Sequence, residues 1–71
     1  MTRTGLREPN LAQRARAKTQ LTQRAFADLI SVSFVTIARW ETDKVCPTGA
    51  AFSLLKLVEA HPKNALRVLK D

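Results

Sequence analysis

The fold is decided by residues 22–41, which read TQRAFADLISVSFVTIARWE. Thr22 is placed to cap a helix over residues 23–30, whose apolar side chains are spaced to face a core. Ser33 is placed to cap a second helix that runs to about Thr42. Only three residues separate the two helices, so they cannot pack as a long antiparallel pair. They are expected to cross at a steep angle, which is the helix-turn-helix arrangement.

Three further helices are predicted around this pair. Asn10 is placed to cap a helix that ends at about Thr19, and Thr48 is placed to cap a fourth helix. Pro62 ends the fourth helix, because proline has no backbone N–H and clashes with the preceding turn. The same proline suits the first turn of a fifth helix over residues 63–70. No stretch shows the alternating apolar pattern of a strand, so the predicted fold is all-α.

Length and composition indicate one small domain. The chain has 71 residues, of which 45% are hydrophobic and only two are glycine. This composition suits a compact helical domain and is too apolar for a disordered tail. A chain of this size buries only about 60% of its unfolded surface, so a partner subunit would add useful cover. We expect residues 1–9 to form a flexible basic arm and residues 10–71 to form the domain.

The charge is strongly positive and unevenly distributed. Twelve Lys and Arg stand against six Asp and Glu, which gives a net charge of +6. Residues 1–24 hold six of the basic residues and a single acid, so most of the excess lies in the first third of the chain. Such a stretch favours polyanions, because each neutralised phosphate releases condensed counterions. A solvated face that keeps the chain soluble would explain the charge equally well, so the positions of the basic residues have to decide.

Several classes of protein are excluded by features that the sequence lacks. Its apolar runs fall short of the roughly 20 residues of a membrane helix, and its start lacks the apolar core of a secretion signal. The single Cys46 forms no internal disulfide, and with the single His61 it makes no zinc site. No paired carboxylates, Gly-rich phosphate loop or nucleophile–His pair indicates an enzyme. We expect a cytoplasmic protein that is not an enzyme and holds no metal or cofactor.

The second helix of the central pair has two different faces. At 100° per residue, Ile37, Trp40 and Glu41 fall on one face, where the two apolar side chains suit anchoring in a core. The opposite face carries Val35, Ala38, Arg39 and Thr42. This face has no acid and fits a DNA major groove, where its small apolar side chains can contact thymine methyl groups and Arg39 can pair with guanine. The alternative for Arg39 is a phosphate contact or a solvent-exposed position.

The start of the first helix of the pair suits a phosphate. Its free N–H groups and positive dipole end lie beside Thr22 and Gln23, which together can hold a backbone phosphate. Three residues in or next to the second helix of the pair are also expected to contact phosphates, namely Ser33, Thr36 and Lys44. The alternative is that Thr22 only caps the helix and Gln23 is only solvated.

As a set, these residues resemble the XRE (Cro/repressor-type) helix-turn-helix family over about residues 11–60. The resemblance is carried by Leu21-Thr22-Gln23, Phe26-Ala27, Val32-Ser33, Thr36-Ile37, Arg39-Trp40-Glu41 and Pro47. It implies a five-helix, lambda-repressor-like fold that binds DNA. The downstream run is similar to a narrower branch that contains HigA and the C-terminal domain of MqsA, antitoxins that repress their own operons. That run comprises Pro47-Thr48-Gly49-Ala50-Ala51, Leu54-Leu55-Lys56-Leu57 and His61-Pro62.

The resemblance also implies roles for individual residues. The positions that match the family's DNA contacts are Gln23 for a phosphate and Phe34, Val35 and Arg39 for the bases. Glu41 matches a position that pairs with an arginine of the first helix, for which Arg16 is at the matching distance. Ser31 and Asp43 stand where the family usually has glycine, and a left-handed serine costs about 1 kcal/mol relative to glycine. Phe34 and Val35 are apolar where many relatives are polar.

The predicted function is that of a sequence-specific DNA-binding repressor, or of the autoregulating antitoxin of a toxin–antitoxin pair. It would bind a palindromic operator as a homodimer. Phe52, Leu66 and Leu69 are expected at the dimer interface, because so small a monomer offers them little cover. Simple packing of the last helix onto the fourth is the alternative for this surface. The rival function is a protein-interaction module, such as a toxin-binding domain or an adaptor, that keeps the fold with little sequence-specific DNA binding.

Overall fold

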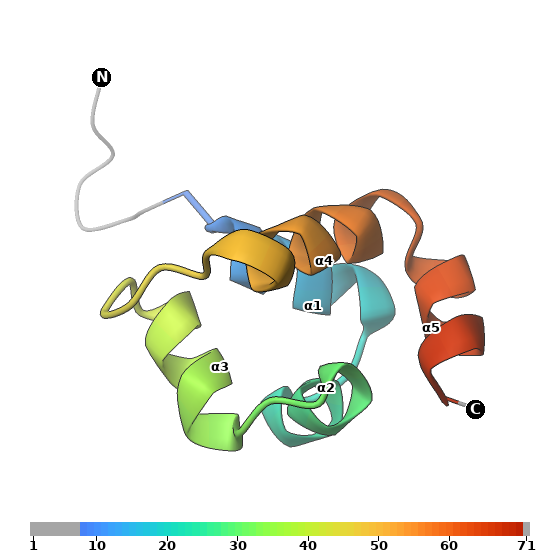
Figure 1. Ribbon diagram of the computed structural model, residues 1–71, viewed down its shortest axis with the longest axis horizontal. Coiled ribbons are helices and arrows are strands. Elements are labelled where there is room, and N and C mark those ends of the chain that lie inside the picture. Colours follow the sequence, from blue (N-terminus) through green and yellow to red (C-terminus); the bar gives the residue numbers. More distant parts are fainter. Residues whose placement is uncertain (1–7, 71) are drawn as a thin grey trace.

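The computed structural model describes residues 8–70, which form five α-helices (Figure 1). The helices are α1 (Leu11–Thr19), α2 (Gln23–Ile30), α3 (Phe34–Glu41), α4 (Gly49–Ala60) and α5 (Pro62–Lys70). No strand occurs in this part of the chain, so the all-α prediction is confirmed. Of the expected basic arm, residues 1–7 lie outside the described residues. None of the helices between residues 8 and 70 has the length and apolar character that a membrane span requires.

Side-chain caps fix where the first three helices begin, as predicted. Asn10, Thr22 and Ser33 accept the backbone amide three residues further on, at 2.9, 3.1 and 3.0 Å. Each cap satisfies an amide that has no partner inside its helix. Thr48 is the N-cap residue of α4 as expected, but the prediction that its side chain caps the helix is wrong, because it makes no cap hydrogen bond. The Thr48 carbonyl oxygen accepts the Ala51 amide instead, at 3.2 Å.

Left-handed residues turn the chain at three helix ends. They are Gln20, Ser31 and Asp43, with φ of 63°, 64° and 63°. At the end of α2 the Val32 amide reaches back to the carbonyl oxygen of Ala27 at 3.0 Å. This bond satisfies one of the last carbonyls of the helix and reverses the chain toward α3. The glycine-like conformation implied for Ser31 and Asp43 is therefore present, without glycine.

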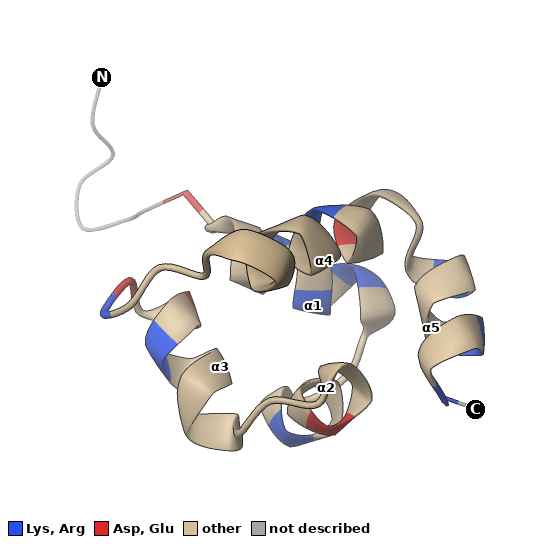
Figure 2. Ribbon diagram, viewed as in Figure 1, with Lys and Arg blue, Asp and Glu red and all other residues tan. Residues whose placement is uncertain are grey.

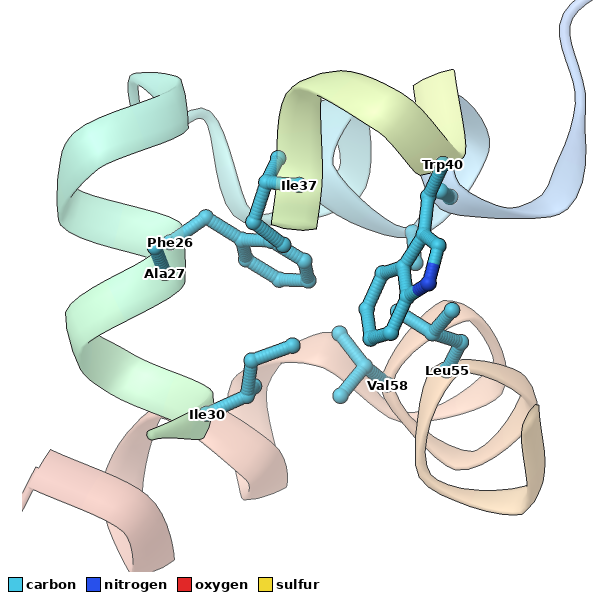
Figure 3. Close-up of a cluster of buried hydrophobic side chains, with 9 residues drawn as sticks. Phe26, Ala27, Ile30, Ile37, Trp40, Leu55 and Val58 are labelled. Atoms are coloured by element: carbon cyan, nitrogen blue, oxygen red, sulfur yellow. The ribbon is translucent and has the colours of Figure 1, made fainter. Parts of the chain in front are cut away.

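The core lies where α1, α2, α3 and α4 meet. Its fully buried large side chains are Phe26, Ile37, Leu55 and Val58. Figure 3 shows Phe26 and Ile37 pointing toward one another, with Trp40 close to the α4 side chains. Trp40 and Ile37 are both buried, which confirms the predicted inner face of α3. Ala12 and Ala15 are buried on α1 and are small enough to let α4 lie close along it.

A buried carboxylate at the end of α3 joins three helices. Glu41 is 5% exposed, and its Oε2 accepts a hydrogen bond from Arg16 Nε at 2.6 Å. Its Oε1 accepts from Arg16 Nη2 at 3.1 Å and from Gln23 Nε2 at 3.0 Å. The hydrogen bonds to this carboxylate raise the pKa of Arg16 above its usual value. Glu41 therefore ties the end of α3 to the middle of α1 and to the first residue of α2.

The N-cap of α1 adds a second tie to the same end of α3. Asn10 Nδ2 donates to the carbonyl oxygens of Trp40 at 2.9 Å and of Glu41 at 3.2 Å. It also donates to Asp43 Oδ1 at 3.0 Å. One side chain thus caps α1 and satisfies carbonyls that the end of α3 leaves without helical partners. The sequence predicted only the first of these two roles.

Arg16→Met is expected to lower the free energy of unfolding by about 3–5 kcal/mol, because it leaves the Glu41 carboxylate buried without its charge partner. Glu41→Gln should cost less, since Arg16 is 28% exposed and also donates to the Leu21 carbonyl oxygen. Denaturant unfolding of both single variants and of the double variant gives the coupling free energy.

Arg14→Met is the matched control, because Arg14 pairs with Glu59 at 2.7 Å on the surface, where the two side chains are 45% and 29% exposed. That change should cost less than about 1 kcal/mol. Equal losses for Arg14→Met and Arg16→Met would show that Glu41 does not need its partner.

Candidate nucleic-acid interface

The outer face of α3 is an exposed surface without carboxylates. Phe34 is 37% exposed and Val35 is 52% exposed, while Arg39 is also exposed and Ala38 is half-buried. All four were predicted to face bases. Val35 and Arg39 lie on the side of α3 opposite the buried Ile37, whereas Phe34 and the half-buried Ala38 lie at its flanks. The only acid of α3 is Glu41, which is buried and paired. An anionic ligand that approaches this face therefore meets no unpaired negative charge from α3.

Thr22 and Gln23 lie together at the first turn of α2. The Thr22 hydroxyl oxygen accepts the Ala25 amide, so its own hydrogen stays available to a ligand. One N–H of the Gln23 amide is used by Glu41, and the second remains. The backbone amides of Gln23 and Arg24 have no partner inside the helix, because they belong to its first turn. The N-terminus of α2 thus presents hydrogen-bond donors next to α3.

Ser33 and Thr36 form a hydroxyl pair at the start of α3. Their oxygens are 2.8 Å apart, and the Ser33 oxygen also accepts the Thr36 amide at 3.0 Å. One of the two hydroxyl hydrogens is used between them, whichever residue donates, so one is left for an outside acceptor. Lys44 lies beyond the other end of α3, where its amide donates to the Arg39 carbonyl oxygen and its side chain is exposed.

Arg24 is a member of this surface that the sequence analysis did not select. It is exposed at the second position of α2, and its guanidinium carbon lies 4.6 Å from the centroid of the Phe34 ring. In Figure 2, basic residues lie on both α2 and α3. The position of Arg24 beside Gln23 was a hint in the sequence, but its contact with Phe34 depends on how α2 crosses α3.

The basic residues of the first third of the chain are only partly available. Within the described residues, Arg14 and Arg16 form ion pairs with Glu59 and Glu41. Lys18 and Arg24 are exposed and form no salt bridge with any residue between 8 and 70. Internal pairing thus uses part of the positive charge of the first third of the chain, for which a polyanion and a solvated face were equally open explanations. The remainder includes the cations beside and on α3.

A second exposed surface lies on α4 and α5, where the dimer interface was expected. Leu69 is half-buried, because it packs against the core and also lines a groove at the surface, so it has more cover than expected. Its place in a dimer interface stays a prediction. Leu66 is half-buried, and Phe52 is 44% exposed with Lys56 stacked over its ring. An apolar groove of about 240 Å³ separates α4 from α5. Its lining includes Leu54, Leu57, Ala65, Val68 and Leu69.

Comparison with known proteins agrees with this arrangement. Residues 13–57 match the helix-turn-helix family, which is more than half of the chain. Among curated proteins the chain is similar to Antitoxin HigA-2 of Vibrio cholerae serotype O1, with 38% identity over 49 residues. That match covers 69% of this chain and 47% of the relative, so the chain spans about half the length of the protein it matches. No solved structure matches.

The matched segment begins inside α1 and ends inside α4, and it contains both α2 and α3 with the turn between them. The resemblance inferred from individual residues is therefore confirmed. The chain belongs to the XRE-type helix-turn-helix family of DNA-binding proteins.

Proposed function

We propose that this protein is a sequence-specific transcriptional repressor that binds a palindromic operator as a homodimer, with α3 in the major groove. The main support for this proposal is the outer face of α3, where Val35 and Arg39 are exposed and α3 has no free carboxylate. It acts in the cytoplasm and uses no enzymatic step, metal or cofactor.

The expected roles follow from where the side chains lie. Val35 and Ala38 present methyl groups suited to thymine, and Arg39 presents a planar set of donors that matches the acceptors of guanine. Phosphate contacts would flank the groove and fix the register of α3 on the duplex. The donors proposed for them are those of Thr22, Gln23, Ser33, Thr36 and Lys44.

An antitoxin role is the narrower proposal, and it rests on the name of the relative HigA-2. The chain spans about half of that relative, and the partner that we propose for it is a toxin protein. A neighbouring gene for a small ribonuclease-like toxin would support this role. A pure protein-interaction module is the rival function, and the exposed Arg39 on an acid-free α3 face argues against it.

Dimerisation is proposed because one short reading helix contacts too few base pairs to select a site in a genome. Two copies related by a two-fold axis would place their α3 helices in successive major grooves, about 34–36 Å apart. Leu57 and Val68 are 56% and 63% exposed at the edges of the α4–α5 groove. We propose this apolar edge, which also includes Leu69, as the contact between copies. Leu66 and Phe52 do not line this groove, and their place in the interface stays a prediction.

Arg39→Ala is expected to weaken binding by about 1–3 kcal/mol to a duplex enriched by in vitro selection with the wild-type protein. The loss should be much smaller on a scrambled duplex, because guanine pairing depends on sequence. Fluorescence anisotropy titrations measure both affinities. Lys63→Ala, an exposed cation on α5, is the control for the lost charge. Equal losses on the two duplexes would make Arg39 a phosphate contact.

Val68→Glu is expected to turn a dimer into a folded monomer, because it puts a charge into the apolar contact. Lys63→Gln changes the net charge by the same amount and lies about 140° around α5 from Val68, so it should leave the dimer intact. Sedimentation equilibrium gives the mass, and circular dichroism checks the fold. A wild-type protein that stays monomeric at high concentration, with and without the selected duplex, would refute the dimer.

A further inference from the structure

Arg24 and Phe34 form a cation–π pair between α2 and the start of α3. The guanidinium carbon of Arg24 lies 4.6 Å from the ring centroid of Phe34, within the range of a cation–π contact. Both residues are exposed, so the pair lies on the surface. Arg24 has no salt bridge with any residue from 8 to 70, in contrast to Arg14 and Arg16. Its charge is therefore not neutralised within the described fold.

A guanidinium above an aromatic ring keeps its hydrogen-bonding capacity. The contact with the π-face uses no conventional acceptor, so the five N–H donors of Arg24 remain for a ligand. The ring also restricts the side chain, which otherwise loses considerable rotamer entropy when it binds a ligand. Phe34 thus holds a cation in place without occupying its donors.

The position of the pair identifies the ligand chemistry. Phe34 is the first residue of α3, the proposed reading helix, and Arg24 projects over it from α2. A helix that enters a major groove has the sugar–phosphate backbone on either side of the groove. A cation beside the first residue of that helix therefore faces the groove edge, where planar donors match a phosphate in two hydrogen bonds.

We propose that Arg24 binds a backbone phosphate of the operator and that Phe34 is the residue that positions it. This inference rests on the proposed function and adds one phosphate contact to it. It also revises the role of Phe34, which the sequence analysis assigned to base reading. Part of the Phe34 contribution then comes through Arg24 and does not depend on the base sequence. An aromatic ring at this position is required, because an aliphatic side chain offers the guanidinium no π-face.

The test measures DNA affinity by fluorescence anisotropy over a series of salt concentrations. The probes are a duplex enriched by in vitro selection with the wild-type protein and a mixed-sequence duplex of the same length. The variants are Arg24→Gln, Phe34→Leu, Phe34→Trp and the double variant Arg24→Gln/Phe34→Leu. Lys63→Gln removes the same charge from α5 and is the control. Thermal unfolding of each variant checks that it is folded, which we expect because the substituted positions are exposed.

Arg24→Gln should weaken binding to both duplexes by about the same factor, roughly 5- to 10-fold, and reduce the salt slope by about 1. The same change in the Phe34→Leu background should cost much less, because the positioning ring is already gone. Phe34→Trp should retain the wild-type salt slope.

Arg24→Gln binding that equals Lys63→Gln binding would overturn the phosphate contact. An undiminished loss in the Phe34→Leu background would overturn the positioning role. A wild-type protein that enriches no duplex and binds neither probe would contradict the proposed function itself. If Arg39→Ala weakens binding to the selected duplex and Arg24→Gln does not, the phosphate contact of Arg24 is refuted while the proposed function stands.

Discussion

The buried Glu41 carboxylate is the interaction on which the rest of this structure depends. It is the last residue of α3, and it accepts hydrogen bonds from Arg16 on α1 and from Gln23 at the first position of α2. A charge at 5% exposure is costly unless it is paired, so the three helices must keep this mutual arrangement. The crossing of α2 and α3 is fixed in this way from the polar side, while Phe26 and Ile37 fix it from the apolar side.

The inward position of the same carboxylate leaves the outer face of α3 without an acid. A free acid on the outer face would repel DNA, whereas here the single acid of α3 points inward and neutralises Arg16. The cations beside α3 that remain unpaired are therefore on the outside. Charge pairing and packing thus favour the same orientation of α3. Ile37 and Trp40 anchor the helix in the core, and Val35 and Arg39 face the solvent.

Local chemistry made much of the fold predictable from the sequence. Capping at Asn10, Thr22 and Ser33 and the break before Pro62 depend on neighbours within a few residues, and the helix bounds followed them closely. The inner face of α3 was predictable because helical periodicity applies along its whole length.

Contacts between distant segments were not predictable in this way. Asn10 binds the carbonyls at the end of α3, and Arg24 stacks on Phe34, only because separate helices meet there. The partial cover of Leu69 was not predictable for the same reason, since spacing within α5 does not show that the core reaches this side chain. The family relationship was recognisable because its residues lie in one continuous segment, 13–57.

The proposed DNA-binding face consists of α3 and the first turn of α2. Nuclear magnetic resonance of the ¹⁵N-labelled protein, titrated with a duplex enriched by in vitro selection, tests it directly. We expect the largest amide shifts at Thr22 to Arg24 and Phe34 to Arg39, with the indole N–H of Trp40 nearly unchanged because Trp40 is buried. Shifts confined to α4 and α5, with α3 unaffected, would contradict it.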